Sequence, residues 1–139
     1  MKLFVTVLCG ITLLVFSASA DEPNVETSDK NPTAQAELVQ EKIKEHFPQK
    51  HPVMLAIANC ESTGYIHWEN GELRPNSEGK SSAAGVFQVL LNLHAEEIRR
   101  LGLDMNNIDD YMTFVKYLQK SQGYGAWKAS KHCWGKRVS

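Results

Sequence analysis

The segment that decides the fold spans residues 53–88 and reads VMLAIANCESTGYIHWENGELRPNSEGKSSAAGVFQ. Its apolar opening closes at Cys60 and Glu61, which predicts a buried helix that ends there. Pro52 stands at the start of that helix, where a missing N–H costs little. Residues 62–84 are rich in glycine, serine, asparagine and proline, which predicts a loop or a short hairpin beside Glu61.

Helical spacing of apolar residues continues on both sides of this segment. Expected helices lie at 37–47, 53–61, 84–91, 94–101, 108–118 and 126–132. Asn107 or Asp109 is expected to cap the fifth of them, and Gly102 to end the fourth. Because strand alternation is absent beyond the loop, the expected fold is a compact, mostly α-helical α+β domain over residues 37–139.

The first 36 residues fall outside that domain. A positive start, an apolar run over residues 3–16 and small residues at 17–20 predict a secretory signal peptide, cleaved after Ala20. The alternative is a membrane anchor, but the run is shorter than the ~20 residues that span a bilayer. No stable membrane insertion is therefore expected after cleavage. Residues 21–36 are acidic and nearly free of apolar side chains, which predicts a disordered leader.

Export changes the cysteine count. Cys9 leaves with the signal peptide, and Cys60 and Cys133 remain as an even pair in an oxidising compartment. We expect a disulfide between them, with two separate buried thiols as the alternative. In the chain-entropy model a loop of this length stabilises the fold by about 4 kcal/mol. The expected location is secreted or periplasmic.

The composition argues against several kinds of protein. The chain is 42% apolar and 22% charged with a formal net charge of −1, and nothing in it indicates nucleic-acid binding. The five histidines show no metal-ligand spacing, so no metal or other cofactor is expected. The even cysteine count disfavours a Cys–His hydrolase built on Cys60. The basic residues near the end could attract an anionic polymer, or form a solvated terminus: Lys128, Lys131, Lys136 and Arg137.

Two blocks carry a family resemblance. The stretch ANCES at 58–62 and the stretch SAAGVFQ at 82–88 resemble the signature of the lytic transglycosylases. The ending GAWKASKHCWG at 125–135 is similar to that of secreted proteins related to resuscitation-promoting factors. The resemblance covers residues 53–135. It implies a lysozyme-like fold that cuts peptidoglycan between N-acetylmuramic acid and N-acetylglucosamine.

The resemblance also implies roles for individual residues. Glu61 is the expected catalytic acid and base, and apolar walls around it are expected to raise its carboxyl pKa. The alternative for Glu61 is an exposed glutamate at a helix end. Gln88 is expected to contact substrate or brace the Glu61 region, Ser82 to line the cleft, and Gly85 to allow close backbone approach.

The chain departs from the larger soluble transglycosylases near its end. Their Tyr-Asn-Ala-Gly block is absent, and residues 123–127 stand near its place. Tyr124 or Trp127 is expected to supply an aromatic platform for a sugar, with core packing as the alternative for both.

The number of carboxylates separates two reactions. Hydrolysis usually needs a second carboxylate, and Glu69, Glu72 and Glu78 have no spacing that singles one out. Lytic transglycosylases, as the resemblance implies, need one, because the 6-hydroxyl of muramic acid attacks the anomeric carbon. We therefore favour a 1,6-anhydro product. The alternatives are a lysozyme-type hydrolase, a peptidoglycan-binding protein without activity, and a secreted inhibitor or effector. The expected partner is the glycan strand, and the protein is expected to act as a monomer.

Overall fold

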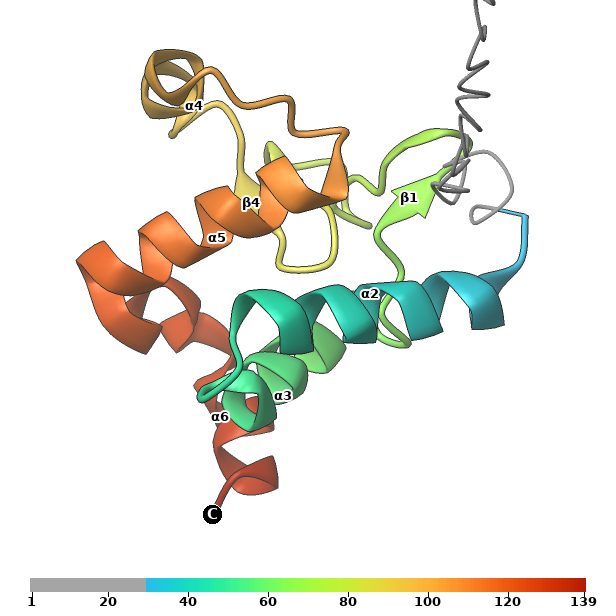
Figure 1. Cartoon of the computed structure of the whole chain (residues 1–139), viewed down its shortest axis with the longest axis vertical. Coiled ribbons are helices and arrows are strands. Elements are labelled where there is room, and N and C mark those ends of the chain that lie inside the picture. Colours follow the sequence, from blue (N-terminus) through green and yellow to red (C-terminus); the bar gives the residue numbers. More distant parts are fainter. Residues whose placement is uncertain (1–29) are drawn as a thin grey trace, which may run out of the picture.

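A computed structural model describes residues 30–139 (Figure 1). The predicted signal peptide and residues 21–29 of the predicted leader lie outside the described residues. The described part is compact and mostly helical, with two small antiparallel strand pairs, which confirms the predicted α+β class. Among residues 30–139 no helix has both the length and the apolar content needed to cross a bilayer.

The elements follow one another as α2 (Pro32–His46), α3 (His51–Ser62), β1 (Trp68–Glu69), β2 (Glu72–Leu73), β3 (Ala83–Ala84), β4 (Val89–Leu90), α4 (Ala95–Leu101), α5 (Ile108–Gln122), the 3-10 helix η1 (Gly123–Ser130), α6 (Lys131–Trp134) and η2 (Gly135–Arg137). Two predicted helix ends are confirmed. The Asn107 side chain caps α5 by accepting from the backbone N–H of Asp109 and Asp110. Gly102 ends α4 in the left-handed conformation.

The predicted leader boundary is wrong, because α2 begins at Pro32 rather than at residue 37. Asn31 caps the helix, and Gln35 is only 1% exposed. The Gln35 Oε1 accepts from the backbone N–H groups of His67 and Trp68, at 2.5 and 2.8 Å. Composition missed this part of the helix because a buried polar side chain, rather than an apolar one, fixes it.

The loop after α3 contains the predicted short hairpin. Strands β1 and β2 pair antiparallel, and Asn70 and Gly71 turn the chain between them with φ of 54° and 80°. Positive φ at both central residues is typical of the tight turn that suits the twist of a hairpin.

The prediction of a helix starting at residues 84–91 is wrong, because this segment forms the second hairpin, β3 with β4. Gly85 and Gln88 hold the turn with φ of 74° and 49°. A side chain at position 85 would have its Cβ 2.7 Å from the Tyr111 ring. The close approach of α5 therefore requires glycine here and stops a helix.

The core lies between the three long helices and the hairpins. Figure 1 shows α2 in the middle, with α5 on one side and α3 on the other. The large, deeply buried apolar side chains come from all of these elements: Val39, Ile43, Met54, Ile57, Trp68, Val86, Phe87, Tyr111, Met112, Phe114 and Val115. The short α6 packs on α3, which brings residues 131–134 against the end of α3.

Candidate active site

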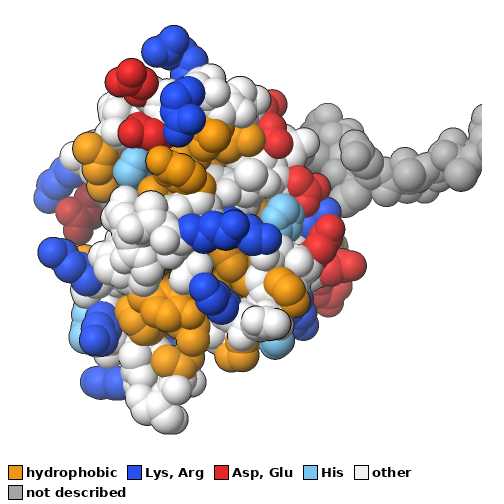
Figure 2. Space-filling view, turned by 60° about the vertical axis from the view of Figure 1, so that its left-hand side comes forward, with side chains coloured by type: hydrophobic (Ala, Val, Ile, Leu, Met, Phe, Trp, Pro, Cys, Tyr) orange, Lys and Arg blue, Asp and Glu red, His pale blue; other side chains and the backbone are white. Residues whose placement is uncertain are grey.

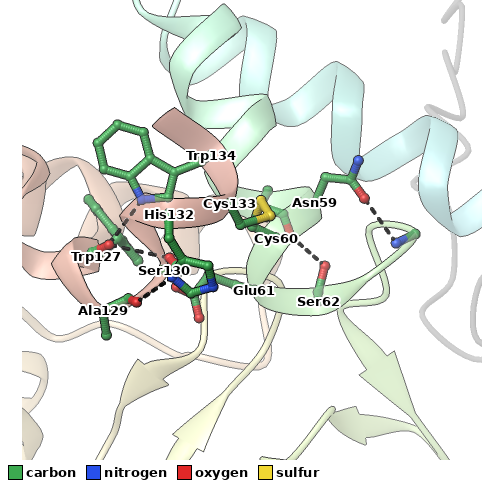
Figure 3. The surroundings of a disulfide bond; sticks show 12 residues. Asn59, Cys60, Glu61, Ser62, Trp127, Ala129, Ser130, His132, Cys133 and Trp134 are labelled. Carbon is green, nitrogen blue, oxygen red and sulfur yellow. Dashed lines mark hydrogen bonds between the residues drawn. A yellow bond between two sulfur atoms is a disulfide. The ribbon is translucent and has the colours of Figure 1, made fainter. Parts of the chain in front are cut away.

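The predicted disulfide is confirmed. Cys60, on the last turn of α3, is bonded to Cys133 on α6, with Cα atoms 6.1 Å apart (Figure 3). Stable disulfides are typical of exported proteins. The bond ties the end of α3 to the C-terminal segment at the point where Glu61 follows.

Glu61 is half-buried, and a side chain from the C-terminal segment holds it. The Ser130 hydroxyl donates to Glu61 Oε1 at 2.5 Å, as Figure 3 shows. Glu61 lies next to Cys60, and Ser130 precedes Cys133 by one turn, so the disulfide restrains both partners of this hydrogen bond. The alternative of an exposed glutamate at the helix end is therefore wrong.

Two effects act on the Glu61 carboxyl. Burial raises its pKa by disfavouring the charged form, and the hydrogen bond from Ser130 lowers its pKa. Burial is the larger effect, so the pKa lies above that of an ordinary glutamate. Such a carboxyl keeps its proton closer to neutral pH and is suited to act as a general acid.

The Ser130 hydroxyl can satisfy both protonation states of Glu61. It also lies 3.2 Å from the Trp127 carbonyl oxygen, but it has one hydrogen to donate. When Glu61 is ionised, that hydrogen goes to the carboxylate. When Glu61 is protonated, its O–H can donate to Ser130 Oγ while Ser130 donates to Trp127. The carboxyl can therefore lose and regain a proton without leaving its place.

Trp127 joins this site to the second hairpin from inside the core. It is 5% exposed, and its indole N–H donates to the Phe87 carbonyl oxygen at 3.1 Å. The prediction of Trp127 as a sugar platform is wrong, because both the ring and its donor are used in packing. Tyr124 is half-buried and its ring packs 5.9 Å from that of Trp134. A substrate contact at Tyr124 stays a prediction.

Tyr111 fixes the turn of the second hairpin. Its hydroxyl donates to the Ala84 carbonyl oxygen at 2.8 Å and accepts from the Phe87 N–H at 3.1 Å. Gly85 therefore does allow close approach, but of a tyrosine rather than of substrate. Gln88 is half-buried, and its amide donates to the Gly85 carbonyl oxygen at 3.0 Å. This bond braces the turn, and any contact of Gln88 with substrate stays a prediction.

Ser82 lies at a hollow that Glu61 does not line. Its hydroxyl oxygen accepts from the Asn92 N–H at 3.0 Å, and it lines a cavity of about 440 Å³ together with Glu72 and Asn106. Glu61 is not among the residues that line this cavity. The structure thus does not bring Ser82 to the Glu61 carboxyl.

The sequence did not indicate Arg74 or Ser62 as structural supports of the site. The Ser62 hydroxyl donates to the Ala58 carbonyl oxygen at 2.7 Å, which closes the last turn of α3. The Arg74 guanidinium, from the end of the first hairpin, donates to the Ser62 carbonyl oxygen. The serine that follows Glu61 is therefore buried and structural, and the hairpin fixes the backbone just past Glu61.

The loop carboxylates lack the environment of Glu61. Glu69 and Glu72 face each other across the first hairpin and are exposed, and Glu78 forms an exposed ion pair with Lys80 at 3.2 Å. In the described part of the chain, only Glu45, His46 and Asp109 bring ligand atoms close enough for a metal ion. The Lys42 ammonium lies 2.9 Å from Asp109 and 3.2 Å from Glu45, so a cation already neutralises this group.

Comparison of the chain with protein-family models, curated proteins and solved structures finds no match. The resemblance to lytic transglycosylases therefore stays a prediction from the motifs at 58–62 and 82–88. The function is inferred from the geometry around Glu61.

Proposed function

We propose that this protein cleaves peptidoglycan strands between N-acetylmuramic acid and N-acetylglucosamine, with Glu61 as its single acid and base. The observation that carries the proposal is the environment of the Glu61 carboxyl. Burial raises its pKa, Ser130 holds one of its oxygens, and a disulfide anchors the adjacent residue. A proton donor for a glycosidic oxygen needs this partial desolvation.

The proposed reaction uses one proton in a closed cycle. Protonated Glu61 gives its proton to the glycosidic oxygen as the bond from that oxygen to the anomeric carbon of muramic acid breaks. The 6-hydroxyl of the same sugar then bonds to the anomeric carbon, and its proton passes to the Glu61 carboxylate. The product is a 1,6-anhydro sugar, and water is not consumed. Ser130 stabilises the carboxylate between the two transfers.

The lysozyme-type alternative needs a second carboxylate near the anomeric carbon. Glu69, Glu72 and Glu78 lie on exposed parts of the loop, and Glu78 is already paired with Lys80. This arrangement favours the single-carboxylate reaction. Hydrolysis remains the second candidate, because the three glutamates lie on the loop that directly follows Glu61.

The test is digestion of purified peptidoglycan, followed by mass analysis of the soluble fragments. The expected fragments end in an anhydro sugar, one water lighter than hydrolytic products. Glu61→Gln keeps the shape but cannot donate a proton, so activity should fall by roughly 10²–10⁴-fold or more. Glu78→Gln is the matched control and should keep most activity. Ordinary reducing ends would favour the hydrolase, and an active Glu61→Gln protein would overturn the proposal.

A further inference from the structure

The C-terminal part of the described chain carries positive charge without negative charge. From Tyr111 to Ser139 there are six lysines and arginines and no aspartate or glutamate, whereas residues 30–110 hold twelve acidic and eight basic side chains. The six cations are all exposed: Lys116, Lys120, Lys128, Lys131, Lys136 and Arg137. Within residues 30–139 none of the six forms an ion pair, in contrast to Lys42 and Lys80.

Two of these lysines, Lys116 and Lys120, line a hollow together with Lys50. A cavity of about 210 Å³ lies between the turn that joins α2 to α3 and the second half of α5, lined by Lys50, Lys116 and Lys120. His46 and Gln119 also line it, and no carboxylate does. The Lys50 ammonium donates to the buried Gln119 Oε1 at 3.0 Å, which holds it beside α5. A second hollow of about 290 Å³ shares Lys116 and Lys120.

Ammonium groups gathered without a counter-charge repel one another, and the field they create attracts anions. Figure 2 shows lysine and arginine side chains spread over this face, among hydrophobic and uncharged side chains, with acidic side chains toward its edges. We propose that the six cations of residues 111–139 and Lys50, here called the basic tract, bind an extended phosphate-bearing polymer that has no bases. This inference is independent of the proposed cleavage by Glu61.

The arrangement of the tract indicates the class of ligand. Its charges follow α5, η1, α6 and η2 in succession, which suits a long chain better than a small ion. All but one are lysines, which bind phosphate as point charges.

The aromatic side chains on the same elements pack against other rings, including the half-buried Tyr124, whose ring centroid lies 5.9 Å from that of Trp134. Trp127 and Trp134 are buried, and Tyr117 stacks on Phe114 with ring centroids 5.6 Å apart. Proteins that bind single-stranded nucleic acid combine positive charge with open aromatic platforms. The tract has the charge without the platforms, which disfavours a polymer whose recognition depends on stacked bases.

The probe is linear inorganic polyphosphate, titrated into the intact secreted protein at several salt concentrations. Binding is expected, with log K falling linearly as log salt rises. The variant Lys116→Gln/Lys120→Gln should weaken binding by about tenfold or more at low salt and reduce the salt slope by about two. Lys80→Gln is the matched control, because Lys80 is exposed but paired with Glu78. Glu61→Gln should bind as the unmodified protein does.

Several results would overturn this inference. One is equal binding by the unmodified protein and a folded Lys116→Gln/Lys120→Gln variant, with folding verified by circular dichroism. Polyglutamate of the same charge, bound as tightly as polyphosphate, would remove the assignment to phosphate. A single-stranded oligonucleotide bound more tightly per charge than polyphosphate would show that the tract does recognise bases.

Discussion

At the scale of single residues, the Ser130 hydroxyl sets how firmly the Glu61 carboxyl holds its proton. The 2.5 Å hydrogen bond from Ser130 favours the ionised form of Glu61, and Ser130→Ala removes this bond. The Glu61 pKa should therefore rise further. Turnover should fall roughly ten- to hundredfold, because a hydrogen bond to a charged group contributes about 1.5–3 kcal/mol. Carbon NMR titration of the Glu61 carboxyl measures the pKa without any need for activity. Ser130→Thr keeps the hydroxyl and serves as the control; an unchanged Glu61 pKa in Ser130→Ala would contradict this role.

His67 is a second residue whose burial has a measurable consequence. It is fully buried, its Nδ1 accepts from the Val86 N–H at 3.1 Å, and its Nε2 has no hydrogen-bond partner among residues 30–139. Burial lowers its pKa from 6.5 to about 3. The unfolded chain therefore binds a proton first as the pH falls below 6.5, so the stability associated with neutral His67 is lost progressively down to about pH 3.

This loss should reach about 2 kcal/mol between pH 7 and pH 5. Urea unfolding at each pH measures it. His67→Gln should be less stable than the unmodified protein at pH 7, but its stability should depend less on pH by that amount. The matched variant His51→Gln removes a half-buried histidine elsewhere and controls for the loss of an imidazole as such. Equal pH dependence in His67→Gln and the unmodified protein would show that His67 titrates normally.

At the scale of elements, the first turn of α2 binds the backbone at the start of the first hairpin through the Gln35 side chain. A chain that begins at Ala36 loses the Asn31 cap and the Gln35 side chain, which holds the N–H groups of His67 and Trp68. A lost cap costs about 1 kcal/mol, and each buried donor left unpaired costs about 1–3 kcal/mol. Thermal unfolding should therefore show a loss of several kcal/mol. A chain that begins at Lys30 is the control and should be fully stable, whereas equal stability of both would mean that Gln35 is dispensable.

At the scale of the whole molecule, the disulfide joins the two halves of the site. Its partners are 73 residues apart, and a loop of that length stabilises by about 4 kcal/mol in the chain-entropy model. Cys60→Ser/Cys133→Ser should lower the free energy of unfolding by an amount of that order. It should also loosen α6 and so weaken the contact between Ser130 and Glu61. Denaturant unfolding and hydrogen exchange measure the two effects, and thiols in the unreduced protein that react with an alkylating reagent would exclude the bond.

The sequence by itself determined the features that depend on local pattern. Periodicity and caps located the long helices, including the start of α5 at Asn107 and the end of α4 at Gly102. The even cysteine count and the expected export predicted the disulfide. The apolar run before Glu61 predicted the partial burial of the Glu61 carboxyl. The helix predictions held because hydrogen bonds within a helix, caps and apolar faces join residues only a few positions apart. The disulfide prediction held because two cysteines allow a single pairing.

Only the tertiary structure decided which distant groups meet. The approach of Tyr111 makes residues 85–88 a turn, although their apolar pattern also suits a helix. The Phe87 carbonyl oxygen accepts the hydrogen bond that holds the Trp127 indole in the core. Ser130 reaches Glu61 across 69 residues of chain. The physical reason is the same in each case: a hydrogen bond between remote segments depends on where packing places them, and local periodicity carries no information about that position.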